Sequence, residues 1–446
     1  MSNEFAFKLF DGNNQYNEIK PSDEEIEVIN NKSCLNYKNL KLISYSDALN
    51  KVLSEISMPL PIEEINVIDS LGSILRENIY SNHSIPPFSK ATMDGFAVKK
   101  KDVDNASIEH PIKLEVIGTI KAGLKKDLHI QNGQAARIMT GAPVPQGADM
   151  VIMVEETRCS GAYVEILDAS KGNRFILEEG ADIKKGVLVL EKGVKITPCE
   201  MGMISGCGKS KIKVSKQPKI GIISTGDELA EPGTNADKGQ IYDINGYSLT
   251  GIAKFYGADA EFIGIVRDTY RDLMEIFAKT KGYDILLISG GVSVGDFDIV
   301  QETLLKAGVK KIFWRVKIKP GKPIFFGKRD KQLIFGLPGN PVSSMINFML
   351  FIIPALDKMT DSNQIGLKTG SAILTNDFKL NPGRKKFLRG KLEFINEQLY
   401  VSIFSIQESG VFSPMLKADA IIEVSEESSV LNKGDKVKIF FMPFGI

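Results

Sequence analysis

Four glycine-containing loops between residues 219 and 341 carry the residue types that bind phosphate groups. Each lies at or near the end of a short apolar run, and in order they read TGDEL (225–229), SGGVSVGD (289–296), KPGKP (319–323) and PGNP (338–341). Glycine lets backbone N–H groups approach an anion, lysine supplies positive charge, and carboxylates suit a divalent cation. The combination predicts a site for a phosphorylated ligand and a divalent cation.

The glycine-rich loop at 289–296 precedes a predicted helix. Its backbone could bring several N–H groups against an anion, helped by the dipole of that helix. No G-K-[ST] sequence follows, so the loop is not a P-loop. The alternative interpretation is a tight strand–helix turn, and Asp296 would be the N-cap of the helix in either case.

The KPGK turn at 319–322 favours oxyanion binding. Proline followed by glycine suits a type II turn, which would place the ammonium groups of Lys319 and Lys322 around one point. Upstream, Arg315 and Lys317 alternate with apolar residues, so a continuous strand would put three cations on one face together with Lys319. A lysine-blunted edge strand is the alternative.

The remaining loops have structural explanations as well. Asn340 and Pro341 are typical of a helix N-cap and first helical position, and a ligand phosphate at the same N-terminus would be the functional addition. Asp227 and Glu228 would lie beside the cationic loops, where a divalent ion could separate them from phosphate. Helix capping by Asp227 is the competing account, and the segment GQIYDIN (239–245) carries the same ambiguity.

Length and composition set the class of protein. With 446 residues, 43% hydrophobic residues and a net charge of +1, the chain is typical of a soluble protein of about three or four domains without a global attraction to nucleic acid or membranes. The four cysteines and three histidines are scattered, which argues against structural zinc and a disulfide framework and favours the cytoplasm. The N-terminus does not resemble a signal peptide, and the apolar stretch 345–356 is predicted to be a buried helix.

The spacing of apolar residues divides the chain into segments with different predicted secondary structure. Residues 1–41 are predicted to be a poorly ordered extension, 46–58 a helix capped by Ser46 or Asp47, and 68–77 a second helix. Short strands and glycine turns dominate from 86 to about 218. From 219 to 359, strands at 220–224, 261–266, 285–289 and 333–337 alternate with helices near 245–256, 270–281, 297–307 and 341–357, which predicts a doubly wound, mostly parallel α/β domain. Short strands after 361 predict a C-terminal β barrel or sandwich.

Two segments of the β-rich region complete the set of motifs. TMDGFAV (92–98) presents one acid before an apolar strand, and RIMTGAPVPQGAD (137–149) is a strand, a proline-stiffened loop and a second strand. Alone, each is typical of a hairpin.

Together the motifs resemble the molybdopterin molybdenumtransferase family, which includes MoeA and the E domain of gephyrin. The resemblance covers residues 42 to the C-terminus through TMDGFAV, RIMTGAPVPQGAD, ISTGDEL, GQIYDIN, SGGVSVGD, IKPGKP and LPGNPVS, and then PGRKKFLRG and QESGVFSPMLKADAI. It implies an elongated discontinuous domain (42–85 and 168–217), an inserted β domain (86–167), a molybdopterin-binding α/β domain (218–360) and a C-terminal β barrel (361–446).

The resemblance also implies a reaction and a set of site residues. The reaction inserts molybdate into adenylylated molybdopterin with release of AMP and the help of Mg²⁺, in a homodimer whose cleft is shared between subunits. Other proteins of molybdenum cofactor biosynthesis are implied as possible partners. The candidate catalytic residues are Asp94, Thr140, Asp149, Asp182 and Asp227, and Asp94, Asp227 and Glu228 are the candidates for Mg²⁺. The candidate substrate-binding residues are Thr225, Gly226, Glu228, Asp243, Ser289, Gly290, Gly291, Ser293, Gly295, Asp296, Arg315, Lys319, Lys322, Pro338, Gly339, Asn340 and Ser343.

One departure from the family pattern leaves alternatives open. Many relatives have an acid where this chain has Ala181, immediately before Asp182. If that acid assists catalysis, this chain relies on Asp182 or works more slowly. One alternative function is molybdopterin adenylyl transfer, because the family that performs it resembles the 219–359 domain alone. The other is a non-catalytic carrier or scaffold, which the loss of an acid at Ala181 would favour.

Overall fold

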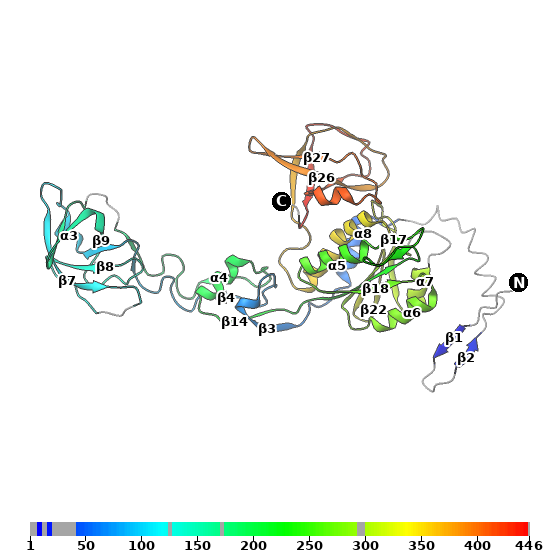
Figure 1. Ribbon diagram of the computed structural model, residues 1–446, viewed down its shortest axis with the longest axis horizontal. Coiled ribbons are helices and arrows are strands. Elements are labelled where there is room, and N and C mark those ends of the chain that lie inside the picture. Colours follow the sequence, from blue (N-terminus) through cyan, green and yellow to red (C-terminus); the bar gives the residue numbers. More distant parts are fainter. Residues whose placement is uncertain are drawn as a thin grey trace. The chain divides into compact units, whose positions relative to one another are not determined.

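The computed structural model describes residues 7–10, 16–19, 42–123, 127–169, 174–291 and 299–444. The chain forms two compact units, of which unit 1 comprises residues 1–61 and 216–446 and unit 2 comprises residues 62–215 (Figure 1). The extension predicted at 1–41 lies outside the described residues, apart from an antiparallel hairpin of β1 (Phe7–Phe10) and β2 (Tyr16–Ile19).

The centre of unit 1 is a six-stranded sheet in the order β18-β15-β19-β23-β22-β20. The first four strands are parallel, and the last two join antiparallel at one edge. Their bounds are β15 Lys219–Thr225, β18 Asp259–Val266, β19 Ile285–Ser289, β20 Lys310–Trp314, β22 Phe325–Arg329 and β23 Gln332–Leu337. The predicted doubly wound, mostly parallel domain is confirmed.

Helices cover both faces of this sheet because its strands alternate their apolar side chains between two cores. Ile285 and Leu287 of β19 pack with α2 (Tyr45–Ser54), α5 (Asn245–Phe255), α8 (Pro341–Asn347) and α9 (Ile353–Met359). Leu286 and Ile288 face the other way, toward α6 (Tyr270–Lys279) and α7 (Ile299–Lys306). Because the four central strands run parallel, the loops that follow them lie along one edge of the sheet.

The helix α8 continues through a π-helical segment, Phe348–Ile352, into α9. The run Pro341–Met359 is long and apolar enough to cross a membrane by length and composition, with a mean hydropathy of 1.4, but 89% of it is buried inside the protein. The structure confirms the predicted buried core helix.

A closed barrel forms the C-terminal part of unit 1. Its strands follow the order β26-β27-β24-β30-β28, and a pairing of β28 with β26 closes the ring. The bounds are β24 Thr369–Leu374, β26 Lys385–Ile395, β27 Gln398–Ile403, β28 Ala420–Val424 and β30 Lys436–Phe441, with a separate pair of β25 (Phe378–Lys379) and β29 (Val430–Leu431). The predicted β barrel is confirmed.

Two features join the barrel to the α/β domain. The short strand β21 (Ile318–Lys319) leaves the α/β domain and adds in parallel to β26 of the barrel. Tyr45 of α2 places its ring against Phe351 and Phe387, with ring centroids 5.6 and 5.2 Å away. One aromatic residue therefore contacts the α/β core helix and the barrel together.

Unit 2 is built around a six-stranded sheet in the order β10-β11-β7-β8-β6-β9. Its strands are β6 Gly95–Val98, β7 Ile112–Ile120, β8 Gln134–Ile138, β9 Met150–Met153, β10 Thr157–Ser160 and β11 Tyr163–Ile166, with the short helix α3 (Lys100–Val103). The described residues of the unit also form α4 (Pro198–Gly206) and three two-stranded ribbons. These are β3 (Ile62–Asn66) with β14 (Lys211–Ser215), β4 (Ile79–Tyr80) with β13 (Leu188–Leu190), and β5 (Lys90–Ala91) with β12 (Ile176–Leu177).

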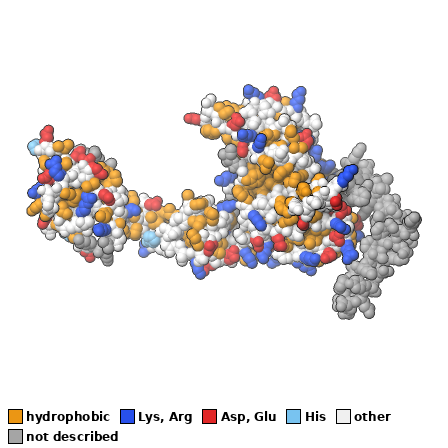
Figure 2. All heavy atoms as spheres, viewed as in Figure 1, with side chains coloured by type: hydrophobic (Ala, Val, Ile, Leu, Met, Phe, Trp, Pro, Cys, Tyr) orange, Lys and Arg blue, Asp and Glu red, His pale blue; other side chains and the backbone are white. Residues whose placement is uncertain are grey.

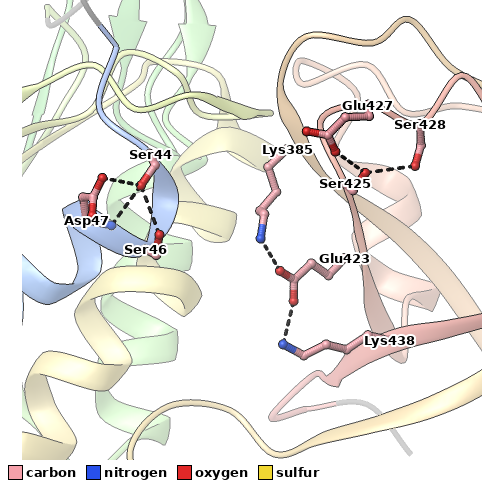
Figure 3. A network of polar contacts seen from close by, with 9 residues as sticks. All are labelled: Ser44, Ser46, Asp47, Lys385, Glu423, Ser425, Glu427, Ser428 and Lys438. Carbon is pink, nitrogen blue, oxygen red and sulfur yellow. Dashed lines mark hydrogen bonds and ion pairs between the residues drawn. The ribbon is translucent and has the colours of Figure 1, made fainter.

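Two helix predictions need correction. The helix predicted at 68–77 is wrong, because only Val67–Asp69 forms a 3-10 turn and Gly72 then adopts a φ of 81°. The chain continues extended, and Leu75 pairs with Val214. In α2, the N-cap is Ser44, whose hydroxyl accepts a hydrogen bond from the Asp47 backbone N–H at 3.1 Å. That contact is drawn in Figure 3.

Candidate functional site

A cavity of about 680 Å³ lies in unit 1 between the α/β domain and the barrel. The KPGK turn and the start of α8 supply one side, and the barrel supplies the other. Among the predicted site residues, those that line the cavity are Arg315, Lys319, Lys322, Pro338, Asn340 and Ser343. The structure therefore brings together residues from two of the four predicted loops.

The prediction that Arg315, Lys317 and Lys319 share one strand face is wrong. Strand β20 ends at Trp314, and Arg315 adopts a left-handed backbone conformation with a φ of 68°. This bend turns the Arg315 side chain into the protein, where it is only 4% exposed. Lys317 instead pairs with Glu426 of the barrel. Arg315 and Lys319 line the cavity, and Lys317 does not.

The barrel contributes cations that the loop motifs did not predict. Arg384 and Lys386 line the cavity beside the KPGK turn, because β21 pairs with β26. Burial lowers the pKa of Lys322, and the neighbouring Arg315 and Arg384 lower it further. The segment PGRKKFLRG contained the signal, but only the pairing of β21 with β26 brings it to the cavity.

The glycine loop after β19 packs tightly against β15. A side chain at Gly290 would bring its Cβ within 2.3 Å of the Thr225 carbonyl oxygen, and Gly290 has a φ of 102°. Gly291 is also left-handed, with a φ of 57°. The Ser289 hydroxyl donates to the Pro338 carbonyl at 3.4 Å. The rest of the loop, including Ser293, Gly295 and Asp296, lies outside the described residues.

The start of α8 agrees with its prediction. Asn340 occupies the N-cap and Pro341 the first turn, but the Asn340 side chain does not cap the helix. Its amide instead donates to the Ser409 hydroxyl of the barrel at 3.1 Å. Gly339 accepts a hydrogen bond from the Asn245 side-chain amide at 2.7 Å. The 338–341 turn is thus held by the barrel and by α5.

Three carboxylates gather where β15 and β18 end. Asp227 and Glu228 lie in a turn after β15 and Gly226, so the alternative of helix capping by Asp227 is wrong. Asp268, two residues after β18, was not predicted. Burial raises the pKa of Asp268, and the nearby Glu228 and Asp227 carboxylates raise it further against an opposing effect of Thr225. Because β15 and β18 are neighbours, these acids crowd one edge of the sheet.

Asp243 has a structural role. Its carboxylate accepts from the Gly246 backbone N–H at 3.1 and 3.2 Å and so caps the first turn of α5. This hydrogen bonding satisfies an otherwise unpaired helix N–H group.

The acidic edge suits a magnesium ion that a ligand helps to bind. Among the described residues, no group of three or more His, Cys, Asp or Glu side chains has the arrangement of a complete metal site. Mg²⁺ commonly takes only one or two carboxylates and completes its shell with water and substrate phosphates. Burial, and after it the neighbouring carboxylates, raises the pKa of Asp268, and a bound cation would oppose this effect.

In unit 2, Asp94 and Thr140 are in direct contact. The Thr140 backbone N–H and hydroxyl both donate to Asp94 Oδ1, at 2.7 and 2.8 Å. These two hydrogen bonds hold the pKa of Asp94 below its usual range, and Arg137 contributes in the same direction. The loops before β6 and after β8 meet here because Gly95 pairs with Ile138.

The other acids of unit 2 lie elsewhere. Asp149 accepts a hydrogen bond from the Lys100 backbone N–H at 2.6 Å, at the start of α3. It lies at the Val98 end of β6, whereas Asp94 lies at the Gly95 end, roughly 15 Å away at about 3.3 Å per strand residue. Asp182 is exposed, and its backbone N–H donates to the Ile85 carbonyl oxygen.

The fold and the site define an α/β protein with a cavity whose lysine and arginine side chains suit an anionic ligand. Comparison with known proteins identifies the family. The family models MoeA N-terminal region (domain I and II), Probable molybdopterin binding domain and MoeA C-terminal region (domain IV) match residues 43–208, 221–358 and 371–441. The molybdopterin molybdenumtransferase of Haemophilus influenzae is 33% identical over 403 residues, covering 89% of this chain and 98% of that protein. That of Bacillus subtilis is 30% identical and covers 85% and 90%.

A solved structure agrees. The molybdopterin biosynthesis MoeA protein of Pyrococcus horikoshii is 32% identical, covers 90% of this chain and 100% of its own, and superposes with a TM-score of 0.75. The chain belongs to the MoeA family of molybdopterin molybdenumtransferases.

Proposed function

We propose that this protein is an enzyme of molybdenum cofactor biosynthesis that inserts molybdate into adenylylated molybdopterin and releases AMP. The observation that carries the proposal is the cationic cavity of about 680 Å³. It occurs in a chain that matches molybdopterin molybdenumtransferases over most of its length. The substrate's phosphates and molybdate are anions, and this cavity presents several positive side chains to them.

Each side of the cavity has a separate task in this proposal. Lys319, Lys322 and Arg315 neutralise the anionic groups and fix their position, which lowers the cost of bringing two anions together. Ser343 and Asn340 supply hydrogen-bonding groups at the N-terminus of α8, where the helix dipole also favours negative charge. Thr225, Gly226, Ser289, Gly290 and Gly291, at the ends of β15 and β19, would extend the site toward the acidic edge.

Asp227, Glu228 and Asp268 are the residues that would hold Mg²⁺. The ion would supply charge neutralisation for the phosphate groups at bond cleavage. The protein's own contribution is to place these carboxylates after the neighbouring strands β15 and β18, with Asp268 partly buried.

Asp94 is the acid of unit 2 that we propose to act on the substrate. Thr140 fixes one oxygen, Oδ1, and the carboxylate remains exposed. An anchored, ionised carboxylate can orient a water molecule or a metal-bound group. Asp149 and Asp182 stay as predicted contributors, with Asp182 replacing the acid that the family pattern has at position 181.

We further propose a cytoplasmic homodimer. Four exposed apolar side chains cluster in sequence around β17 (Ile241–Tyr242) and the start of α5, and they are Ile241, Tyr242, Ile244 and Tyr247. Figure 2 shows hydrophobic side chains gathered on unit 1, among interspersed acidic and basic ones. Exposed apolar groups of this kind are typical of surfaces that a second subunit covers.

The test is single-turnover release of AMP from adenylylated molybdopterin, with and without molybdate and Mg²⁺. Molybdate-stimulated release by the wild type, lost in Asp94→Ala, supports the transferase and its unit 2 acid. Glu109→Ala removes another exposed acid of unit 2 and should behave as the wild type. Tight substrate binding without AMP release would point instead to a carrier, and AMP incorporation from ATP would point to an adenylyltransferase.

A further inference from the structure

The cavity between the α/β domain and the barrel carries an excess of positive charge. Among the described residues that line it, the basic ones are Arg315, Lys319, Lys322, Lys379, Arg384 and Lys386, and the acidic one is Glu408. Glu408 is exposed, whereas Lys386 is only 4% exposed. A buried ammonium group without a carboxylate beside it is unfavourable unless another anion compensates it.

Lys386 lies next to Lys319 across the junction of the two domains. In the parallel pairing of β21 with β26, Ile318 is opposite Lys385 and Lys319 is opposite Lys386. Paired residues of neighbouring strands project from the same face, and such strands lie about 4.8 Å apart. The Lys386 ammonium donates to the Arg384 carbonyl at 3.2 Å.

Among the described residues, the cations Lys319 and Arg384 act on the charge of Lys386. Burial lowers its pKa, and Lys319 and Arg384 lower it further. Lys385, one residue earlier, faces the other way and contacts Glu423 at 2.6 Å (Figure 3). Lys385 thus has a carboxylate partner, whereas the adjacent Lys386 has cations as neighbours.

We propose that Lys386 is an anion-binding residue of this cavity, and that a tetrahedral dianion held between Lys386 and Lys319 strengthens the docking of the barrel on the α/β domain. The inference rests on the proposed function, in which molybdate or a phosphate group of the substrate supplies the dianion. Lys319 belongs to the α/β domain and Lys386 to the barrel, so an anion that contacts both links the two domains. The two domains also share an apolar core that includes Phe351 and Phe387, so the anion would add a polar link to an existing contact.

The experiment is thermal unfolding of the full chain with and without molybdate, compared with inorganic phosphate, together with the molybdate Kd from calorimetry. An anion that binds the folded protein raises Tm by an amount that grows with the logarithm of its concentration relative to Kd. Lys386→Met keeps the apolar stem and removes the charge. We expect its ligand-free Tm to equal or exceed that of the wild type, because a like-charge contact is gone. We expect its molybdate Kd to rise by about tenfold, with most of the anion-induced Tm increase lost.

Lys385→Met is the matched control, since it removes the neighbouring lysine from the opposite face. Its ligand-free Tm should fall, because Glu423 loses a partner, while its response to molybdate stays that of the wild type. Lys386→Gln is the second variant if the methionine variant fails to fold. Lys386→Arg, which keeps the charge, should retain the response.

Two results would overturn the inference, namely a full molybdate response in Lys386→Met or Lys386→Gln, and a wild type that responds to neither anion. A response to molybdate alone assigns the site to the metal oxyanion, and an equal response to phosphate assigns it to a phosphate group of the substrate. AMP release is measured separately. Turnover with an anion response independent of Lys386 refutes only this inference, and a Lys386-dependent response without turnover refutes only the proposed function.

Discussion

Thr140 fixes the carboxylate of Asp94 with two donors on one oxygen. A carboxylate whose pKa is lowered in the folded state stabilises the fold above its unfolded pKa, and this stability is lost as the pH falls through the folded pKa. At neutral pH the carboxylate is therefore ionised and oriented, with its second oxygen available for other contacts.

Replacing Thr140 by valine should loosen this arrangement. The change removes the hydroxyl donor and keeps the backbone donor, so the pKa of Asp94 should rise toward the ordinary aspartate value of about 3.9. We expect AMP release to slow by roughly tenfold or more, in the range of a lost charge-assisted hydrogen bond. Carboxyl NMR titration measures the pKa, and Thr140→Ser should restore both values. An unchanged Asp94 pKa in Thr140→Val would contradict the explanation.

Asp268 differs from Asp94 in that its pKa is raised, so its charge should destabilise the fold at neutral pH. For a carboxyl group whose folded pKa exceeds its unfolded value, stability falls as the pH rises between the two values and stays lower above them. Asp268→Asn should therefore raise the ligand-free Tm at neutral pH and weaken Mg²⁺ binding by at least about tenfold, the scale seen even for indirect metal contacts. Thermal unfolding and Mg²⁺ titration check this. A lower Tm together with unchanged Mg²⁺ affinity would exclude Asp268 from the metal site.

At this scale the sequence indicated Asp227 and Glu228 but not Asp268. The first two follow an apolar run within a glycine turn, which is a local signal. Asp268 lies in a segment without glycine, and its relevance depends on β18 being the neighbour of β15. Strand order in a sheet is a long-range property that local spacing does not carry.

At the scale of elements, the loop after β19 depends on the absence of a side chain at Gly290. Gly290→Ala would force Cβ to within 2.3 Å of the Thr225 carbonyl oxygen at a φ that L-residues rarely adopt. We expect substrate affinity to fall at least tenfold and Tm to drop, since a clash with backbone costs about 1–3 kcal/mol. Gly282→Ala, where the added Cβ meets nothing within 4 Å, is the control that should bind substrate normally. Normal binding by Gly290→Ala would show that the loop does not hold the ligand.

The elements themselves were largely predictable, because apolar periodicity marks them. The four parallel strands and the helices of the α/β domain appear close to their predicted positions, whereas β20 and β22 were not predicted. One error occurs where the backbone bends without a glycine or proline to announce it. Arg315 takes a left-handed conformation that its residue type does not suggest, and this separates Lys317 from the other two cations.

At the scale of the whole molecule, the proposed site residues occupy two units, with the catalytic candidate Asp94 in unit 2 and the substrate-binding candidate Lys322 in unit 1. If two subunits share each active site, mixing inactive Asp94→Ala and Lys322→Ala chains should restore activity. Random exchange makes half of the dimers mixed, each with one intact site, so about a quarter of wild-type AMP release should return. Mixing Asp94→Ala with itself is the control. No recovery after verified subunit exchange would mean that one subunit supplies both residues.

The fold class could be predicted from alternating strand and helix patterns, and the barrel from short strands. The cavity could not, because it requires β21 of the α/β domain to join the barrel sheet beside Lys386. A two-residue strand has no sequence signature of its own.

The two crossings between unit 1 and unit 2 lie side by side. The Lys216 backbone N–H donates to the Pro61 carbonyl at 2.9 Å, and β3 and β14 continue as an antiparallel ladder from that point. Unit 2 is thus an insertion whose entry and exit coincide, which is the geometry that tolerates transplantation of a whole module. Replacing residues 62–215 by an Asn-Gly hairpin turn should leave a continuous, foldable half-enzyme that retains the anion cavity. The same junction offers a place where a different module could be grafted to redirect the chemistry carried out on the bound pterin.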